Sequence, residues 1–431
     1  MLFMSSDRIK PVIDALTLNT VLGDLVAPIA RALQKVRFKE RIFFGISMSD
    51  FITLGVHRHL QANRSLREMV QQLMHFGEAD WPPVARSTFS DALASVPRRD
   101  VLRGVTSPLI AQARASLPDR LADLDIDTDR AVLAMDGTYQ HESVHFRKST
   151  PRNGGEDNPK GHALVTFYDV RLGCPCDVQM DTRSRHETAL LRDYDSSPDA
   201  LTHQKNAFWL VDRAFIDAKF WEAKKKKHKI TMVTRMKASL IINQHDNLPV
   251  ADIDCNAGVV TDQLVELNSA KQFWRLITYR APGGKTVQFL TNEHELEPGV
   301  IAFLYSRRWD EEKCFDTWKN DLAMGKAWGK SPVAIENQVR LAIITSILLA
   351  MFIQDKAGKH GVDDEKSLQK QHRRQTQSKD GTDRPGWTIP LFRYCSKVSR
   401  QIIRFLKFSF SKQASHDLYR RFLWPLMRQY L

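Results

Sequence analysis

Two aspartates in this chain of 431 residues each follow a short, continuously apolar run. Asp136 follows residues 131–135, and Asp212 follows residues 207–211. Such runs are typical of strands buried on both faces, and an aspartate after one keeps its carboxylate at the edge of the sheet. Two such strands side by side would bring two carboxylates together, and hard oxygen ligands of this kind favour Mg²⁺ or Mn²⁺. Taken alone, each aspartate is explained more simply as the start of a turn.

A second group of chemically useful side chains shares one expected helix, which begins after residue 298 and runs to about residue 321. Tyr305, Arg308, Glu312 and Lys319 are separated by three, four and seven residues. On an α-helix this spacing places them within about 60° of one another. Trp309 borders this stripe, and residues 310 and 311 are expected on the opposite side. The alternative explanation is a solvated face with ion pairs one turn apart.

Together the two groups resemble the DDE transposases of bacterial insertion sequences, in particular the insertion sequence four family. That family is recognised by a Tyr-(2)-Arg-(3)-Glu-(6)-Lys signature, which the four stripe residues match without a gap. Its first acidic motif is similar to residues 136–138 (Asp-Gly-Thr), and its second to residues 212–215 (Asp-Arg-Ala-Phe). Ala214 stands where glycine is more usual, so the turn there cannot need a positive φ. The likeness extends over about residues 130–357.

The resemblance implies an RNase H-like fold whose three carboxylates hold two Mg²⁺ ions, for which Mn²⁺ may substitute. Asp136 would end the first strand, Asp212 the fourth, and Glu312 would come from a later helix. Two ions held in this way activate the nucleophile and stabilise the leaving oxygen of a phosphodiester. The implied activity is metal-dependent DNA strand cleavage and strand transfer, which is cut-and-paste transposition through a hairpin at the end of the element.

The remaining stripe residues would contact DNA. Arg308 and Lys319 would hold phosphates beside the scissile bond, and Tyr305 would donate to a phosphate. Trp309 would stack on the base that a tight hairpin leaves unstacked, or would simply pack in the helix. The implied partners are double-stranded DNA, as terminal inverted repeats and as target, and a second copy of the chain. No membrane partner is expected, and the expected location is the bacterial cytoplasm, at the nucleoid.

Two other functions stay open. One is a non-catalytic DNA-binding protein derived from a transposase, which the intact set of three acidic residues disfavours. The other is a stand-alone RNase H-like nuclease, which the phosphate-binding stripe and the large insertion disfavour.

The predicted fold class is α/β, an RNase H-like mixed sheet flanked by helices, with a β-rich insertion and helical terminal regions. The predicted parts are a helical N-terminal region that binds DNA ends (1–125), the first part of the catalytic domain (126–235), the β-rich insertion (236–296), the second part of the catalytic domain (297–357), a polar linker (358–389) and a basic helical tail (390–431).

Within the N-terminal region, a capping box at residues 65–68 opens a helix, and Ser87 opens a second short one. The pair is either a helix-turn-helix that places Arg86 and Ser87 at a DNA groove or an ordinary helical hairpin.

The net charge of +13 is concentrated in the C-terminal part of the sequence. Residues 366–431 hold 15 Lys and Arg against 3 Asp and Glu, a net +12, which leaves about +1 for residues 1–365. In the tail, basic residues recur at helical spacing opposite an apolar face, so it is expected to contact DNA or a second subunit. Residues 341–353 are apolar but about five residues short of a bilayer span, so they predict a buried helix. The five scattered cysteines indicate neither a disulfide framework nor a zinc site.

Overall fold

The computed structural model describes residues 18–40, 43–60, 84–122, 124, 126–141, 161–181, 186–281, 284–320, 322–325 and 327–359. The capping box at residues 65–68 and almost all of the predicted linker and tail lie outside these residues.

A nine-stranded mixed sheet runs through the described residues in the order β3-β2-β1-β4-β5-β9-β8-β7-β6. The pairs β1–β4 and β4–β5 are parallel, and the other neighbouring pairs are antiparallel. The strands are β1 (Val132–His141), β2 (Gly161–Asp169), β3 (Cys174–Asp181), β4 (Phe208–Val211), β5 (Thr231–Arg235), β6 (Ile242–Asn247), β7 (Val259–Leu267), β8 (Phe273–Arg280) and β9 (Thr286–Thr291).

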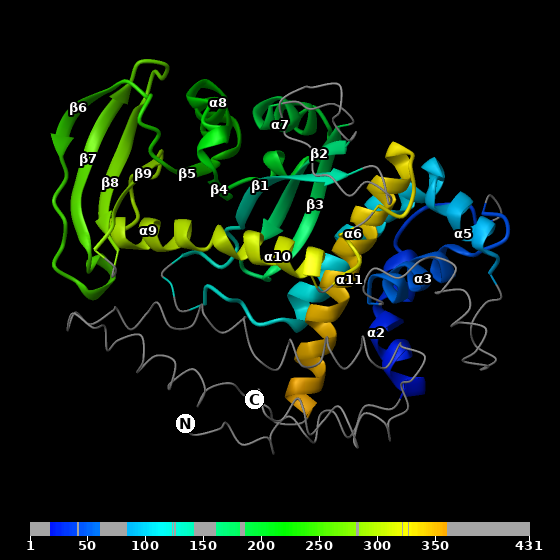
Figure 1. Ribbon diagram of the computed structural model, residues 1–431. Coiled ribbons are helices and arrows are strands. Elements are labelled where there is room, and N and C mark those ends of the chain that lie inside the picture. Colours follow the sequence, from blue (N-terminus) through cyan, green and yellow to red (C-terminus); the bar gives the residue numbers. More distant parts are fainter. Residues whose placement is uncertain are drawn as a thin grey trace.

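Both faces of the central strands are buried, as their continuous apolar runs predict. Met135 and Trp209 point into one core with Trp221, whereas Ala134 and Leu210 point into another with Leu304. Helices α7 and α8 cover the first face, and α9 and α10 lie on the other (Figure 1). The helices are α2 (Leu18–Leu33), α3 (Met48–Leu60), α5 (Arg86–Leu93), α6 (Val96–Ser116), α7 (Glu187–Asp195), α8 (Ala218–His228), α9 (Pro298–Ser306), α10 (Trp309–Asn320) and α11 (Pro332–Lys359).

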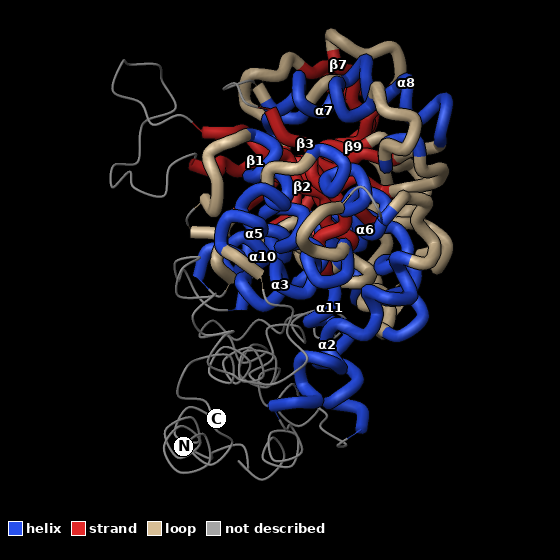
Figure 2. The backbone as a smooth tube through the Cα atoms, turned by 90° about the vertical axis from the view of Figure 1, so that its right-hand side faces the viewer, coloured by secondary structure: helices blue, strands red, loops and turns tan. Residues whose placement is uncertain are grey.

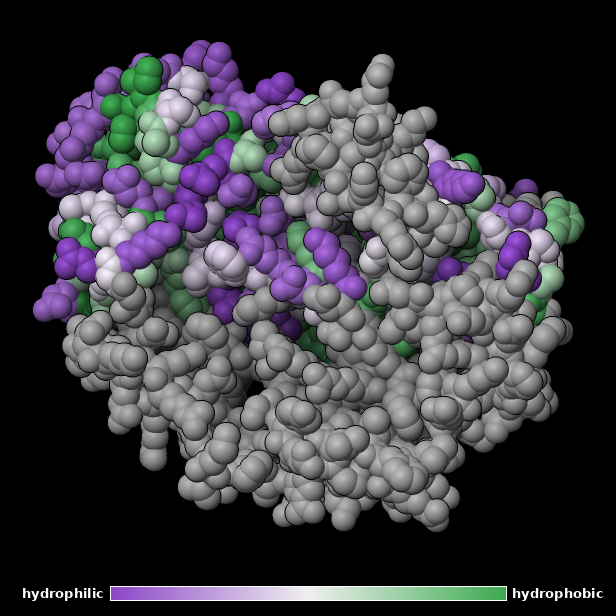
Figure 3. Space-filling model, viewed as in Figure 1, coloured by the Kyte–Doolittle hydropathy of each residue, from purple (hydrophilic) through white to green (hydrophobic). Residues whose placement is uncertain are grey.

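Residues 236–296 carry strands β6 to β9, so this region is rich in β structure as expected. These strands are not a separate sheet, because β9 pairs with β5 and continues the sheet that contains β1 and β4. The outermost strand, β6, is polar and exposed along most of its length. Hydrophilic side chains dominate this part of the surface, with a few apolar ones among them (Figure 3).

Helix α11 packs against the N-terminal helices and the sheet edge at β3, below the strands in Figure 2. Of the helices that the structure describes, only α11 is long and apolar enough to cross a membrane. Of the most apolar part of this helix, 83% is buried inside the fold. Residues 341–353 therefore lie in a core helix, as the sequence predicts.

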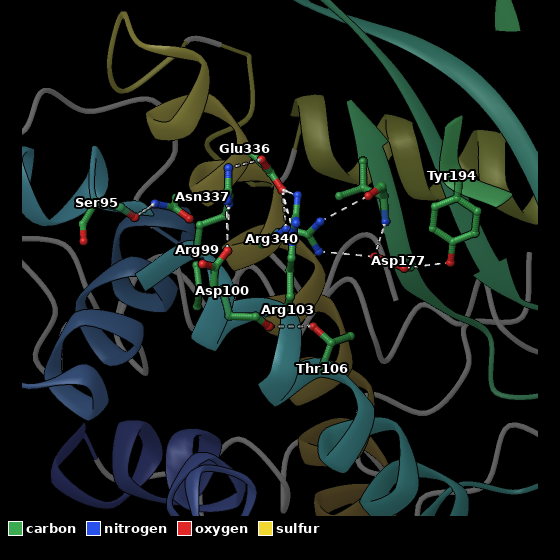
Figure 4. A network of polar contacts seen from close by, with 12 residues as sticks. Ser95, Arg99, Asp100, Arg103, Thr106, Asp177, Tyr194, Glu336, Asn337 and Arg340 are labelled. Atoms are coloured by element: carbon green, nitrogen blue, oxygen red, sulfur yellow. Dashed lines mark hydrogen bonds and ion pairs between the residues drawn. The ribbon is translucent and has the colours of Figure 1, made fainter. Parts of the chain in front are cut away.

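A partly buried ionic network joins the N-terminal helices to the sheet (Figure 4). Glu336 of α11 accepts hydrogen bonds from Arg103 of α6 at 2.6 Å and from Arg340 at 2.9 Å. Arg340 also donates to Asp177 of β3 at 3.2 Å, and Asp177 accepts from Tyr194 of α7 at 2.8 Å. Burial alone raises the pKa of Glu336, but the two arginines outweigh it and hold this pKa below its usual value. One carboxylate therefore fixes α6 and α11 at the edge of the sheet.

We expect Glu336→Gln to lower the free energy of unfolding by about 1.5–3 kcal/mol at neutral pH, because it removes a charged acceptor from two arginines. A carboxyl with a depressed pKa stabilises the fold above its usual pKa and loses this contribution as pH falls through the lower folded value. Urea unfolding at pH 7 and below pH 4 measures the difference, which shrinks at acid pH. Asp100→Asn is the control, since its carboxylate pairs with Arg99 but is 58% exposed. Equal losses for the two variants would contradict the anchoring role of Glu336.

Candidate active site

The register of the two parallel central strands brings the two predicted aspartates to the same level. Met135 of β1 lies opposite Val211 of β4, and the parallel ladder ends at this pair. Asp136 and Asp212 are the next residues on the two strands. The pKa of Asp136 is raised mainly by burial and also by the negative charges of Asp212 and Glu312. The three predicted acidic residues therefore act on one another electrostatically.

The two aspartates differ in how their strands continue. Asp212 follows the last residue of β4, as the sequence predicts. Asp136 does not end its strand, because β1 continues to His141 as an antiparallel partner of β2. The expectation for Asp136 was wrong because an apolar run marks only the part of a strand that is buried on both faces.

The glycine of the first motif lies against a side chain of a neighbouring helix. A Cβ atom on Gly137 would lie 2.2 Å from Oε1 of Glu187, in the first turn of α7. A larger residue at position 137 would therefore require the Glu187 side chain to move. At the second motif, Ala214 lies in a short 3₁₀ helix and does not have a positive φ.

The expected single helix of the stripe is two helices. Helix α9 ends at Ser306 and α10 begins at Trp309, with a turn at Arg307 and Arg308 between them. Tyr305 therefore lies on α9, where it is 3% exposed and packs on Phe289 with ring centroids 5.1 Å apart. Burial raises the pKa of its phenol. The spacing did not predict the break because each short helix keeps a helical pattern of its own.

Arg308 lies between two of the predicted catalytic carboxylates. Its guanidinium donates to Asp136 Oδ2 at 2.9 Å and to Glu312 Oε1 at 2.7 Å. The Arg308 side chain is only 8% exposed, whereas those of Asp136 and Glu312 are 19% and 35% exposed. Burial by itself lowers the pKa of Arg308, but Tyr305, Asp136 and Glu312 outweigh it and raise this pKa. In the chain without DNA or metal, the Arg308 guanidinium thus neutralises the carboxylates of Asp136 and Glu312.

The remaining stripe residues face solvent. Trp309 is 55% exposed at the start of α10, and Lys319 is exposed near its end. Both side chains are accessible to a large ligand that approaches the carboxylates along α10.

Glu311 is a site residue that the spacing argument missed. Instead of facing solvent opposite the stripe, it is 1% exposed and accepts a hydrogen bond from Thr166 of β2 at 2.5 Å. Thr166 is the cross-strand partner of Asp136. Burial, reinforced by the charge of Asp136, holds the pKa of Glu311 well above its usual value. Only the pairing of β1 with β2, which the sequence does not specify, could have indicated this contact.

Asp310, the other residue expected on the far side, is also buried. Its carboxylate forms an ion pair with Arg307 in the turn between the two helices. The Arg307–Asp310 pair therefore joins the turn to the first residues of α10.

The chemistry of the donor set fits a divalent cation. Asp136, Asp212 and Glu312 offer hard oxygen ligands. The arrangement is not closed around an ion, because in the described part of the chain no three His, Cys, Asp or Glu side chains converge closely enough to hold one. Arg308 stands between two of the three, so a metal ion would have to displace its guanidinium.

The mixed sheet flanked by helices, with carboxylates just beyond the parallel ladder of β1 and β4, is consistent with the RNase H-like class of DDE domains. A family model described as "Transposase DDE domain" matches residues 127–348, just over half of the chain. The chain belongs to this family of transposases.

One curated relative is a protein of Sinorhizobium fredii named "Putative transposase y4zB". It is 24% identical over 198 residues, which are 44% of this chain and 53% of the relative. The chain thus spans about half the length of the curated relative that it matches.

We expect Glu311→Gln to fold as stably as the wild type near pH 5 and to become the more stable of the two as pH rises. A carboxyl whose folded pKa is raised loses stability as pH rises above its unfolded pKa, and glutamine removes this titration. Chemical denaturation at pH 5 and pH 8 measures the change. Glu311→Ala is the comparison, and it should lose about 2 kcal/mol or more at both pH values, because it leaves a cavity and an unpaired Thr166. A pH-independent difference between the wild type and Glu311→Gln would contradict the raised pKa.

Proposed function

We propose that this protein is a DDE transposase of the insertion sequence four family. It would cleave DNA at the ends of an insertion sequence and join those ends to a target, through a hairpin intermediate. The observation that carries the proposal is the register of β1 and β4, which sets Asp136 beside Asp212 at the place where α10 presents Glu312. The partners would be the terminal inverted repeats, the target DNA and a second copy of the chain, in a bacterial cytoplasm at the nucleoid.

We propose Asp136, Asp212 and Glu312 as ligands of two Mg²⁺ ions, for which Mn²⁺ may substitute. When bound, such ions activate the attacking oxygen and stabilise the leaving oxygen of a phosphodiester. The residues themselves supply negative charge at one edge of the sheet, on rigid strands and on a helix fixed by the Thr166–Glu311 hydrogen bond. This rigidity favours the fixed geometry that in-line attack on phosphorus needs.

Arg308 has two competing partners in this proposal. In the DNA-free chain it neutralises Asp136 and Glu312. A DNA phosphate offers the same guanidinium a bidentate acceptor, and its transfer to the phosphate would free both carboxylates for metal. DNA and metal would then each favour binding of the other, since the same ion pairs oppose both.

The other stripe residues take outer positions. Exposed Lys319 would hold a phosphate further along α10, and exposed Trp309 would stack on an unpaired base of the hairpin. Tyr305 is buried, and its ring lies 5.9 Å from the Arg308 guanidinium. A buried phenol would position Arg308 and would not contact a phosphate directly.

We expect Asp136→Asn, Asp212→Asn and Glu312→Gln each to lower the rate of DNA cleavage by at least 10³-fold, because each removes a charged oxygen ligand. A duplex that carries the terminal sequence flanking the gene is incubated with Mg²⁺ or Mn²⁺ and its products are resolved on a denaturing gel. Hairpin products support a transposase, whereas nicking at any position supports a nuclease, and binding without cleavage supports a non-catalytic protein. Asp316→Asn, which alters an exposed carboxylate on the same helix as Glu312, is the control. Wild-type cleavage by any of the three variants would refute the assignment of that residue.

We expect Arg308→Gln to increase the affinity for Mn²⁺ without DNA by roughly tenfold, which corresponds to removing about 1.4 kcal/mol of competing ion pair. The same variant should process DNA ends slowly, because the phosphate loses its guanidinium. Electron paramagnetic resonance of free Mn²⁺ measures the affinity, with and without DNA.

Lys319→Gln is the matched control for Arg308→Gln. Its side chain is exposed, and among the described contacts it has no ion pair with the three carboxylates. It should weaken end processing and leave Mn²⁺ affinity unchanged. Equal Mn²⁺ affinity for Arg308→Gln and the wild type would show that Arg308 does not compete with metal.

A further inference from the structure

Four exposed lysines gather at the end of the sheet away from the acidic residues. Lys226, Lys227 and Lys229 lie in and after the last turn of α8, and Lys205 lies in the loop before β4. The backbone N–H of Asn206 donates to the carbonyl oxygen of His228 at 2.8 Å, which fixes the loop beside the end of α8. These four residues are called the lysine surface.

The lysine surface is not neutralised from within the fold. The two other lysines in this part of α8 have internal partners: Lys224 pairs with Asp195, and Lys225 lies 3.8 Å from Glu293. In the part of the chain that the structure describes, no ion pair joins the four exposed lysines to a carboxylate. The nearby acidic groups are thus committed to Lys224 and Lys225, and the surface keeps its positive charge.

The helix dipole explains only part of this cluster. Cations stabilise the carboxyl end of a helix, so one or two lysines there are ordinary. However, the carbonyl oxygens of Lys224 and Lys225 already accept backbone N–H groups from Ile230 and Lys229. Lys205 comes from a different segment, the loop that follows a short 3₁₀ helix (Leu201–His203). A cluster built from two segments indicates an external anion.

The position of the lysine surface separates it from the candidate active site. Lys205 precedes β4 and Asp212 follows it, so the two lie at opposite ends of this strand. At about 3.3 Å per extended residue they are roughly 20 Å apart. Helix α8 also lies on the face of the sheet opposite α10 (Figure 1). DNA bound beside Glu312 would therefore not reach the lysine surface without bending or continuing past the edge of the sheet.

We propose that the lysine surface binds the phosphate backbone of a second segment of duplex DNA, outside the catalytic site. This inference rests on the proposed function for the identity of the polyanion. Lysines are mobile point charges without the fork geometry of arginine, so they suit backbone contacts that do not read sequence. None of the exposed large apolar side chains of the described residues lies on α8 or in the loop before β4, which disfavours a membrane or an apolar protein partner.

The test compares the salt dependence of DNA binding by three proteins. The variant K226Q/K227Q/K229Q removes three charges from the lysine surface, and K237Q/K271Q/K285Q removes three charges from exposed lysines on and around the insertion strands. Fluorescence anisotropy with a duplex of about 40 base pairs gives the slope of log affinity against log salt concentration. The first variant should reduce this slope by about 2.7, since each lost phosphate contact contributes about 0.9. The second should leave it close to the wild-type value, and a thermal melt checks that both are folded.

Equal slopes for the wild type and K226Q/K227Q/K229Q would overturn the proposal. The outcome is independent of catalysis. A reduced slope for the variant, in a protein that never cleaves DNA, would support the lysine surface and refute the proposed function. An unchanged slope, in a protein that does cleave DNA, would refute the lysine surface and support the proposed function. The second segment is either the flank of the DNA in the active site or a separate duplex. Binding of a duplex of about 10 base pairs distinguishes these two cases. If the segment is the flank of the same DNA, the variant binds this short duplex as the wild type does. If it is a separate duplex, the wild type binds two short duplexes and the variant binds one.

Discussion

Repulsion between carboxylates is the constraint on which the candidate site depends. The parallel ladder of β1 and β4 stops at Met135 and Val211, which sets Asp136 and Asp212 at the same level, and α10 adds Glu312. Like charges in a partly buried place raise one another's pKa unless a cation lies among them. Arg308 supplies that cation from the turn between α9 and α10, where a guanidinium can reach Asp136 and Glu312 at once. The break between the two helices therefore places a charge where a continuous helix would keep it on the surface.

The parts of the fold that follow from local patterns could be predicted from the sequence. Residues 131–135 and 207–211 are buried on both faces because every residue in each run is apolar, so the strand has no face to offer to water. Asp212 comes directly after its strand, and residues 341–353 form a core helix because their apolar side chains cover the whole circumference. The strands of residues 236–296 also agree with the β-rich insertion predicted there.

Contacts between distant segments could not be predicted in this way. Glu311 is buried because Thr166 lies opposite Asp136 in an antiparallel pair, and residue spacing within α10 contains no information about that pair. The contact of Glu187 with Gly137 likewise depends on where α7 docks. Strand β6 has a polar sequence and is held by pairing with β7, so no apolar signal marks it. In each case the tertiary partner, and not the local sequence, decides the structure.

The same distinction governs charge. A count gives residues 1–365 a net charge of about +1, which describes a neutral region. A count of charges subtracts every carboxylate from every lysine and arginine, whatever the distance between them. In the folded chain, opposite charges neutralise each other only when they are closer than the screening length of about 8–10 Å. Inside the fold, Asp195, Glu293 and Glu336 are used by internal cations, and Arg308 is used by Asp136 and Glu312. In the part of the chain that the structure describes, the exposed lysines at the end of α8 pair with no carboxylate, although the sum is near zero. A net charge near zero over residues 1–365 is therefore compatible with a basic surface at the end of α8.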